Sequence, residues 1–174
     1  KLNKNIVYIL QIINGGRYVI SMNEKNDIFN EFSTLCRNNF IGPNPIALTK
    51  DTVTNINVDE INNDNYLVSA KADGERYLLY ISLLGNVYLI NSNRDVINTG
   101  LISDNFETII DGEYITEYKP GLSLYKDSSL SYNLEHLFDY RAFDIYYNKS
   151  ESIYTKTLNE RLEILNNINF TKKD

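Results

Sequence analysis

Lys71-Ala72-Asp73-Gly74-Glu75-Arg76 stands between two runs of apolar and aromatic residues, at 66–70 and 77–81. Both runs have the composition of strands, so the stretch predicts a tight glycine turn with a lysine before it and an arginine after it. A lysine amine is a nucleophile when its surroundings keep it partly neutral, and a nearby arginine suits a phosphate. The stretch therefore indicates attack on a phosphorus atom. A solvated, charged Asp-Gly hairpin turn is the plainer alternative.

The composition is that of one folded domain, or most of one, in 174 residues. A net charge of −6 argues against a broad basic groove for nucleic acid, but not against a small phosphate site. The single cysteine, Cys36, excludes an internal disulfide and favours a reducing compartment. No apolar run approaches membrane-spanning length and no signal peptide opens the chain. Because the first residue is Lys1, we expect a piece of a longer protein.

Helical and strand-like patterns alternate along the first half of the chain. Asp27 precedes an apolar stripe with helical spacing, which predicts a helix with Asp27 as N-cap and Cys36 as a buried, unreactive thiol. The loop at 38–45, marked by Gly42-Pro43-Asn44-Pro45, is the best candidate for a domain boundary. Gly85-Asn86 separates two β-rich runs and predicts a hairpin.

The second half of the chain predicts more strands and a final helix. Strands are expected at 108–115 and 141–147, and Thr157-Leu158-Asn159-Glu160 is a capping box that opens a helix. The polar stretch at 117–136 is expected to be a surface loop that carries His136, the single histidine, at the surface. Together these patterns predict an α+β protein whose helices flank an antiparallel sheet.

Three stretches carry the chemistry: the Lys71 turn, Asp111-Gly112-Glu113, and the strand at 141–147. A carboxylate held near a lysine and an arginine can bind a ribose hydroxyl or a divalent metal. An aromatic side chain on the third strand can stack on a purine base. Taken singly, Glu113 is more simply a solvated acid on an edge strand, and Phe143 is more simply a core residue.

In this order the three stretches resemble the motif series of the covalent nucleotidyltransferases, a superfamily that holds mRNA capping guanylyltransferases and polynucleotide ligases. The lead-in at 41–48 is similar to the Gly-Pro-x-Pro segment ahead of the first motif in capping enzymes. The run up to Arg76, the strand at 87–90 and Thr99-Gly100 most resemble capping enzymes of large DNA viruses, of the pox, asfar and mimivirus-like types. The resemblance covers residue 41 to the end and implies an incomplete nucleotidyltransferase core, related to ATP-grasp and DNA-ligase folds.

The resemblance also implies roles for particular residues. Lys71 would attack the α-phosphate of GTP to form a lysyl-GMP intermediate, and the GMP would pass to diphosphate-ended RNA. Glu113 would serve the ribose or a Mg²⁺ or Mn²⁺ ion, and Phe143 would stack on the guanine. The expected nucleotide-binding set is Lys71, Asp73, Arg76, Arg94, Glu113 and Phe143.

The chain also departs from the family pattern. After Tyr147 we find neither the later acidic-Gly strand nor the Lys-x-Lys stretch, and no OB-fold follows. We therefore expect residues 41–174 to be the N-terminal part of a guanylyltransferase domain, unable to complete the reaction alone. Residues 1–40 would be a connector or the tail of a preceding RNA triphosphatase domain.

The wider expectations follow from the same resemblance. We expect a multifunctional viral capping enzyme that acts in the cytoplasm, at a virus factory or in the virion, and that does not associate with membranes. A methyltransferase or RNA polymerase would be its candidate partner. Two alternatives stay open: an ATP-dependent polynucleotide ligase that uses Lys71 with AMP, and a degenerate transferase fold that serves as a non-catalytic interaction module.

Overall fold

The computed structural model of the chain describes residues 18–37, 69–115 and 139–172, together with Ile6, Ile9, Gly42, Pro43, Thr49 and Leu67. The expected loop at 117–136, with His136, lies outside these residues. The chain divides into two compact units. One unit comprises Lys1–Phe40 and Asp73–Asp174, and the other is Ile41–Ala72.

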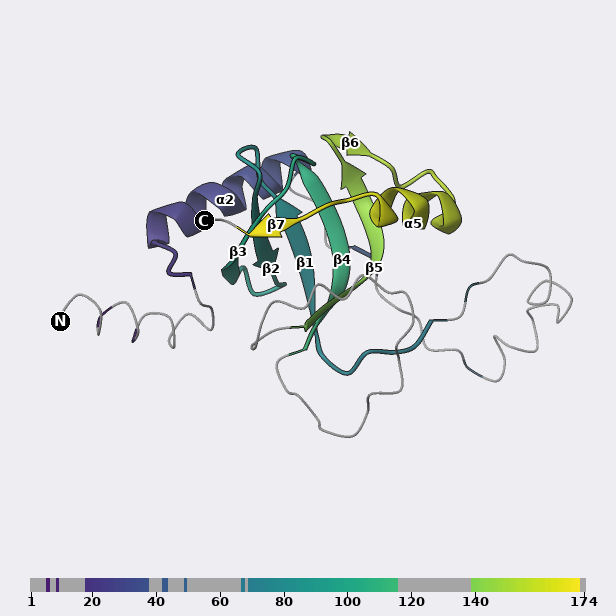
Figure 1. The fold of residues 1–174 in the computed structure, drawn as a ribbon, viewed down its shortest axis with the longest axis horizontal. Coiled ribbons are helices and arrows are strands. Elements are labelled where there is room, and N and C mark those ends of the chain that lie inside the picture. Colours follow the sequence, from purple (N-terminus) through teal and green to yellow (C-terminus); the bar gives the residue numbers. More distant parts are fainter. Residues whose placement is uncertain are drawn as a thin grey trace, which may run out of the picture. The chain divides into compact units, whose positions relative to one another are not determined.

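Among the described residues, seven antiparallel strands form one sheet in the order β6-β5-β4-β1-β2-β3-β7 (Figure 1). The strands are β1 Glu75–Ile81, β2 Asn86–Ile90, β3 Val96–Ile102, β4 Thr108–Ile115, β5 Asp139–Asn148, β6 Glu151–Ser152 and β7 Thr171–Lys172. The helices are α2 Met22–Leu35 and α5 Leu158–Asn166. This is the α+β architecture that the sequence predicts, an antiparallel sheet with flanking helices.

The expected hairpin after β1 is confirmed. The N–H of Gly85 donates to the Ser82 carbonyl at 2.9 Å, and Gly85 takes a φ of +78°, a conformation that glycine adopts without strain. β1 then pairs with β2 on one side and with β4 on the other. The motif-bearing strand therefore lies in the interior of the sheet, with both of its edges occupied.

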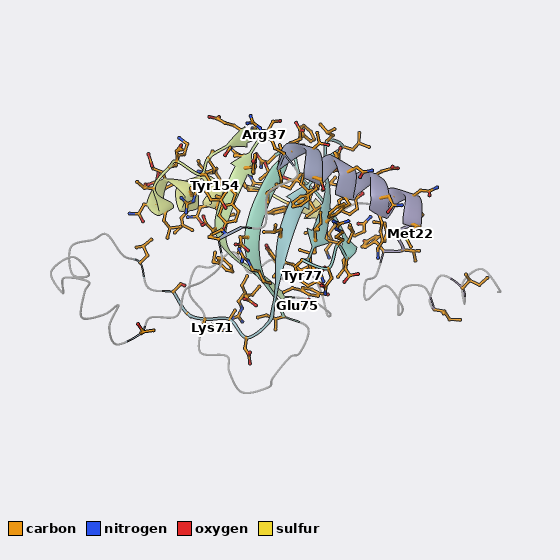
Figure 2. The ribbon with its side chains drawn as sticks, turned by 180° about the vertical axis from the view of Figure 1, so that it is seen from behind. Met22, Arg37, Lys71, Glu75, Tyr77 and Tyr154 are labelled. Atoms are coloured by element: carbon orange, nitrogen blue, oxygen red, sulfur yellow. The ribbon has the colours of Figure 1, made fainter. Side chains whose placement is uncertain are left out.

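Each face of the sheet carries its own apolar cluster. On one face α5 supplies Leu165, which joins Leu79, Leu89, Ile110 and Ile145 in a buried core. On the other face α2 and the residues around it supply Ile20, Phe32 and Cys36, which pack with Tyr80, Tyr88, Ile90, Val96 and Ile109. Neighbouring side chains of β1 therefore enter different clusters, Leu79 the one with α5 and Tyr80 the one with α2. Figures 1 and 2 show these two helices beside the sheet.

The helix expected around Asp27 is present as α2, but it begins earlier. Ser21 is its N-cap, and the Ser21 hydroxyl accepts the Glu24 N–H at 3.1 Å. The assignment of Asp27 as N-cap is wrong because Ser21 caps the helix and Asp27 lies inside it. Cys36 is buried as predicted, and burial raises the pKa of its thiol to about 12. This thiol is therefore an inert core group.

The capping box of α5 is confirmed. The Glu160 N–H donates to the Thr157 hydroxyl, and the Thr157 N–H donates to the Glu160 carboxylate at 2.8 Å. The Thr157 hydroxyl also donates to the Glu160 carboxylate at 2.8 Å. The hydroxyl bond and the backbone N–H bond from Thr157 lower the pKa of Glu160, so the carboxylate stays charged at the positive end of the helix. None of the described helices is long and apolar enough to cross a membrane.

The strand predictions are confirmed for β4 and β5 and fail in two other places. Leu67, Ser69 and Ala70 lie outside any strand, so the strand expected before Lys71 is not formed at these residues. A run of β-forming residues needs a neighbour to pair with, and both edges of β1 are taken by β2 and β4. β3 was not expected, because Asn98, Thr99 and Gly100 interrupt its apolar pattern.

Candidate functional site

Lys71 belongs to the unit Ile41–Ala72 and is exposed. Its Nζ donates to the Ala72 carbonyl at 3.3 Å (labelled in Figure 2). Asp73 is exposed as well, and it begins the part of the other unit that leads into β1 at Glu75.

Gly74 is required for space. A Cβ on Gly74 would lie 2.6 Å from the Tyr114 carbonyl oxygen and 3.2 Å from the Ile115 side chain. No larger residue fits at this point, because real Cβ atoms essentially never come so close to a backbone oxygen. The glycine of the Lys71 motif therefore lets the chain approach the end of β4 closely.

Arg76 is bound to a buried carboxylate on the neighbouring strand. Its Nε donates to Asp111 Oδ1 at 2.9 Å, and its Nη2 donates to Asp111 Oδ2 at 2.5 Å. The Asp111 side chain is fully buried, whereas that of Arg76 is 29% exposed. This two-point contact sets the plane of the guanidinium group at the end of β1.

Tyr146 of β5 completes the shell around Asp111. Its hydroxyl donates to Asp111 Oδ2 at 2.6 Å, and its ring stacks on Tyr154 with the centroids 4.8 Å apart. Burial raises the pKa of Tyr146 well above its usual range, and the Asp111 carboxylate adds to this effect. The tyrosine therefore remains a proton donor to Asp111.

Glu113 lies in a row of charged residues across three strands. It is directly opposite Arg76 on β1 and Arg141 on β5. Directly opposed residues of antiparallel strands share one face of the sheet. Glu113 Oε2 is buried and has no hydrogen-bond partner among the residues that the structure describes, and such an oxygen calls for a hydroxyl or a cation. β4 is an inner strand, so the simpler interpretation of Glu113 as an edge-strand acid is wrong.

The glycine between Asp111 and Glu113 also has a steric reason. A Cβ on Gly112 would lie 2.6 Å from both the Arg141 carbonyl and the Tyr140 ring. The space instead admits the Tyr140 hydroxyl, which donates to the carbonyls of Tyr77 at 2.9 Å and Ile110 at 3.1 Å. Gly112 therefore leaves room for the Tyr140 ring to pack against the backbone of β4.

A second ion pair attaches α5 to the sheet beside the first. Arg161 donates from Nε to Asp144 Oδ1 at 2.8 Å and from Nη2 to Asp144 Oδ2 at 2.9 Å. Asp144 lies opposite Asp111 in the register of β4 and β5. Two neighbouring carboxylates would repel each other, and each is neutralised by an arginine from a different element.

Phe143 and Arg94 occupy different surroundings. Phe143 is 40% exposed on β5, so the simpler interpretation of this ring as core packing is wrong. The Arg94 guanidinium lies 5.2 Å from the ring centre of Phe29 on α2, a cation–π contact. Asn91 shapes the Arg94 loop, because its Oδ1 accepts the N–H groups of Asn93 and Asp95.

The structure therefore brings Arg76 and Glu113 together as neighbours on adjacent strands, with Phe143 on the next strand. Arg94 is engaged with α2, and Lys71 belongs to the other unit. Sequence reasoning missed Asp111, Tyr146, Asp144 and Arg161 as parts of this region. The one available signal was an aspartate inside an apolar β run, because a buried acid needs a partner.

Comparison with known proteins gives the family. The family model described as mRNA capping enzyme, catalytic domain, matches residues 13–173. A probable mRNA-capping enzyme of Acanthamoeba polyphaga mimivirus is 28% identical over 174 residues, covering 96% of this chain and 13% of that protein. An mRNA-capping enzyme of Caenorhabditis elegans is 28% identical over 116 residues, covering 61% of this chain and 18% of that protein. The chain spans less than a fifth of either relative, yet the family model matches nearly all of it, so the chain belongs to the family of mRNA capping enzyme catalytic domains.

Proposed function

We propose that this chain is the first part of the nucleotide-binding core of a GTP:RNA guanylyltransferase. The observation that carries the proposal is the pairing of Arg76 with Glu113 on adjacent strands, directly after the Lys71 turn. Membership of the capping-enzyme family supports GTP as the nucleotide. Capping acts on RNA, so diphosphate-ended RNA is the proposed acceptor.

The proposed reaction has two displacements at one phosphorus atom. The neutral amine of Lys71 attacks the α-phosphate of GTP, a nitrogen–phosphorus bond forms, and pyrophosphate leaves. A terminal oxygen of the RNA diphosphate then attacks the same phosphorus and releases Lys71. Both steps depend on in-line positioning and on neutralising the charge of the phosphates, which is what a fixed arginine supplies.

The proposed contacts follow from the position of each side chain. Arg76 presents a charged, part-exposed group to the ribose or phosphate, and Glu113 offers its buried Oε2 to a ribose hydroxyl. Phe143 has the exposure that a base-stacking ring needs. Asp73 would shape the turn around the nucleotide. Arg94 is also a proposed nucleotide contact, and in this structure its guanidinium group lies over the Phe29 ring.

Glu113 is also the proposed protein contact for Mg²⁺ or Mn²⁺. Glu113 suits such an ion because hard cations prefer carboxylate ligands, and its Oε2 has no hydrogen-bond partner among the described residues. The described residues hold no group of three or more His, Cys, Asp or Glu side chains suited to a metal. We propose that the ion is held by this carboxylate together with the substrate phosphates. When bound, the ion would neutralise charge on the triphosphate.

The proposal extends to the protein that carries this chain. Residues 1–40 would connect to a preceding RNA triphosphatase domain, and 41–174 would begin the guanylyltransferase domain. α2, within the first of these stretches, packs Phe32 against the sheet and so also supports the nucleotide core. The proposed location of the protein is the cytoplasm, at a virus factory or in the virion. Its proposed protein partner is a methyltransferase or an RNA polymerase.

The test is covalent labelling of the longest form of the protein that carries this chain. The protein is incubated with α-labelled GTP or ATP and a divalent metal, then run on a denaturing gel. We expect a labelled GMP adduct that disappears in Lys71→Ala. Lys71→Arg is the matched control, because it keeps the charge but offers a poor nucleophile, and it should also lose the adduct. An AMP adduct would indicate a ligase, and no adduct from a folded protein would indicate the interaction module.

A further inference from the structure

Asp111 has an unusual environment for a residue with no assigned role. Its side chain is fully buried, and both of its oxygens are engaged by side chains from the two flanking strands. Arg76 binds Oδ1 and Oδ2 from β1, and Tyr146 donates to Oδ2 from β5. The carboxylate therefore connects Arg76 to the core of the sheet.

This arrangement restricts an otherwise flexible side chain. A free arginine loses side-chain conformational entropy when it is ordered, and this loss opposes binding. A two-point contact with a buried, immobile carboxylate imposes that order before any ligand arrives. Pre-ordering of a contact group lowers the free-energy cost of binding.

We propose that Asp111 is a positioning residue for Arg76 in the nucleotide site, and that Tyr146 holds Asp111 in place. The inference rests on the proposed function, in which Arg76 contacts the ribose or phosphate of GTP. Asp111 itself touches no substrate in this scheme. It acts by setting the plane of the Arg76 guanidinium group.

Fold stability alone is a weak explanation for this cluster. Replacing a buried ion pair by apolar residues of similar volume is often neutral or stabilising. Here the acid is fully buried, while the arginine keeps 29% of its side chain exposed and lies directly opposite Glu113 in the register of β1 and β4. The charge is thus presented at the surface beside a second polar group, which a purely structural pair does not require.

Tyr146→Phe is the most conservative way to test this, and Tyr88→Phe is its matched control. Both tyrosines are buried, and both donate to a carboxylate, Tyr146 to Asp111 at 2.6 Å and Tyr88 to Glu24 at 3.0 Å. Each substitution removes a tyrosine hydroxyl from a carboxylate, but the Asp111 carboxylate is fully buried and that of Glu24 is only partly so. Tyr146→Phe should therefore cost more stability than Tyr88→Phe, and only Tyr146→Phe loosens the anchor of Arg76.

The measurement is the rate of GMP adduct formation against GTP concentration, in the longest form of the protein. We expect Tyr146→Phe to raise the half-saturating GTP concentration about tenfold, which corresponds to about 1.4 kcal/mol, with little change in the rate at saturation. Tyr88→Phe should leave both quantities near the wild-type values. Thermal unfolding of each variant confirms that the proteins are folded under the assay conditions.

A double-mutant cycle with Arg76→Lys separates positioning from a structural role. If Tyr146 acts through the fixed guanidinium, its effect on half-saturating GTP should largely vanish when Arg76 is already lysine. A structural role predicts additive effects. Additivity, or equal effects of Tyr146→Phe and Tyr88→Phe, would overturn the inference while leaving the guanylyltransferase proposal intact. A wild-type protein that forms no GMP adduct would overturn both.

Discussion

The two ion pairs on β4 and β5 differ in which partner is hidden from water. In the first pair the Asp111 side chain is fully buried and that of Arg76 is 29% exposed. In the second pair Asp144 and Arg161 are similarly enclosed, at 12% and 15%. The first pair holds a charge at the end of β1, and the second attaches α5 to β5. If the proposed function holds, ion pairs of similar geometry serve a nucleotide site in one place and helix packing in another.

The largest loss of folding stability is expected when Arg76 is removed from the first ion pair. Arg76→Leu would leave a fully buried carboxylate with Tyr146 as its remaining donor from this cluster. Removing one partner of a buried ion pair costs about 3–5 kcal/mol, so we expect a loss of that size in the free energy of unfolding. Urea titration measures it.

The control for this prediction removes the isolated charge. Arg76→Leu combined with Asp111→Asn should regain part of the lost stability, because no charge is left buried. If Arg76→Leu alone lowers the free energy of unfolding by less than about 1 kcal/mol, burial of the Asp111 charge does not require Arg76. The proposed difference between the two ion pairs would then be wrong.

A smaller loss is expected for the second pair. Arg161→Leu leaves Asp144 with the Ile145 N–H, which donates to it at 2.8 Å, and with some access to water. We expect a cost of about 1–3 kcal/mol by the same urea titration. GMP adduct formation should stay near the wild-type level, because Arg161 supports α5 and lies outside the proposed nucleotide contacts. A loss of stability as large as that of Arg76→Leu would show that the two pairs are equivalent.

The smallest effect concerns a carboxylate whose partner is a backbone amide. Glu31 on α2 accepts the Leu83 N–H at 3.3 Å, and burial raises the pKa of its carboxyl group. The folded protein therefore holds this proton more tightly than the unfolded chain. The resulting stability is complete below the ordinary carboxyl pKa and is lost as the pH rises through the raised pKa.

Glu31→Gln removes this pH dependence and keeps an oxygen for the Leu83 N–H. We expect the Tm to rise by about 1–3 °C near pH 8, and to change little near pH 4, in thermal unfolding followed by circular dichroism. Glu163→Gln on the exposed side of α5 is the control and should shift neither value. An equal shift at both pH values would mean that burial of the Glu31 charge is not the cause.

The residues that sequence reasoning placed well are those governed by local chemistry. The capping box of Thr157 and Glu160, the turn at Gly85 and the strand over Thr108–Ile115 depend on residues near one another in the chain. The failures at Leu67, Ser69 and Ala70 and at β3 depend on strand pairing. A strand forms only where a neighbouring strand has an unpaired edge, and the composition of a segment does not say which strands have one.

By itself, the sequence determined the order of the motifs, the α+β class and the family, because these follow from residue types and spacing. Only the tertiary structure decided that Arg76 is held by Asp111, that Tyr146 reaches the same carboxylate, and that Arg161 binds Asp144. Asp111 lies 35 positions from Arg76 and from Tyr146. Such contacts arise from the register of three strands, and register is a property of the folded sheet.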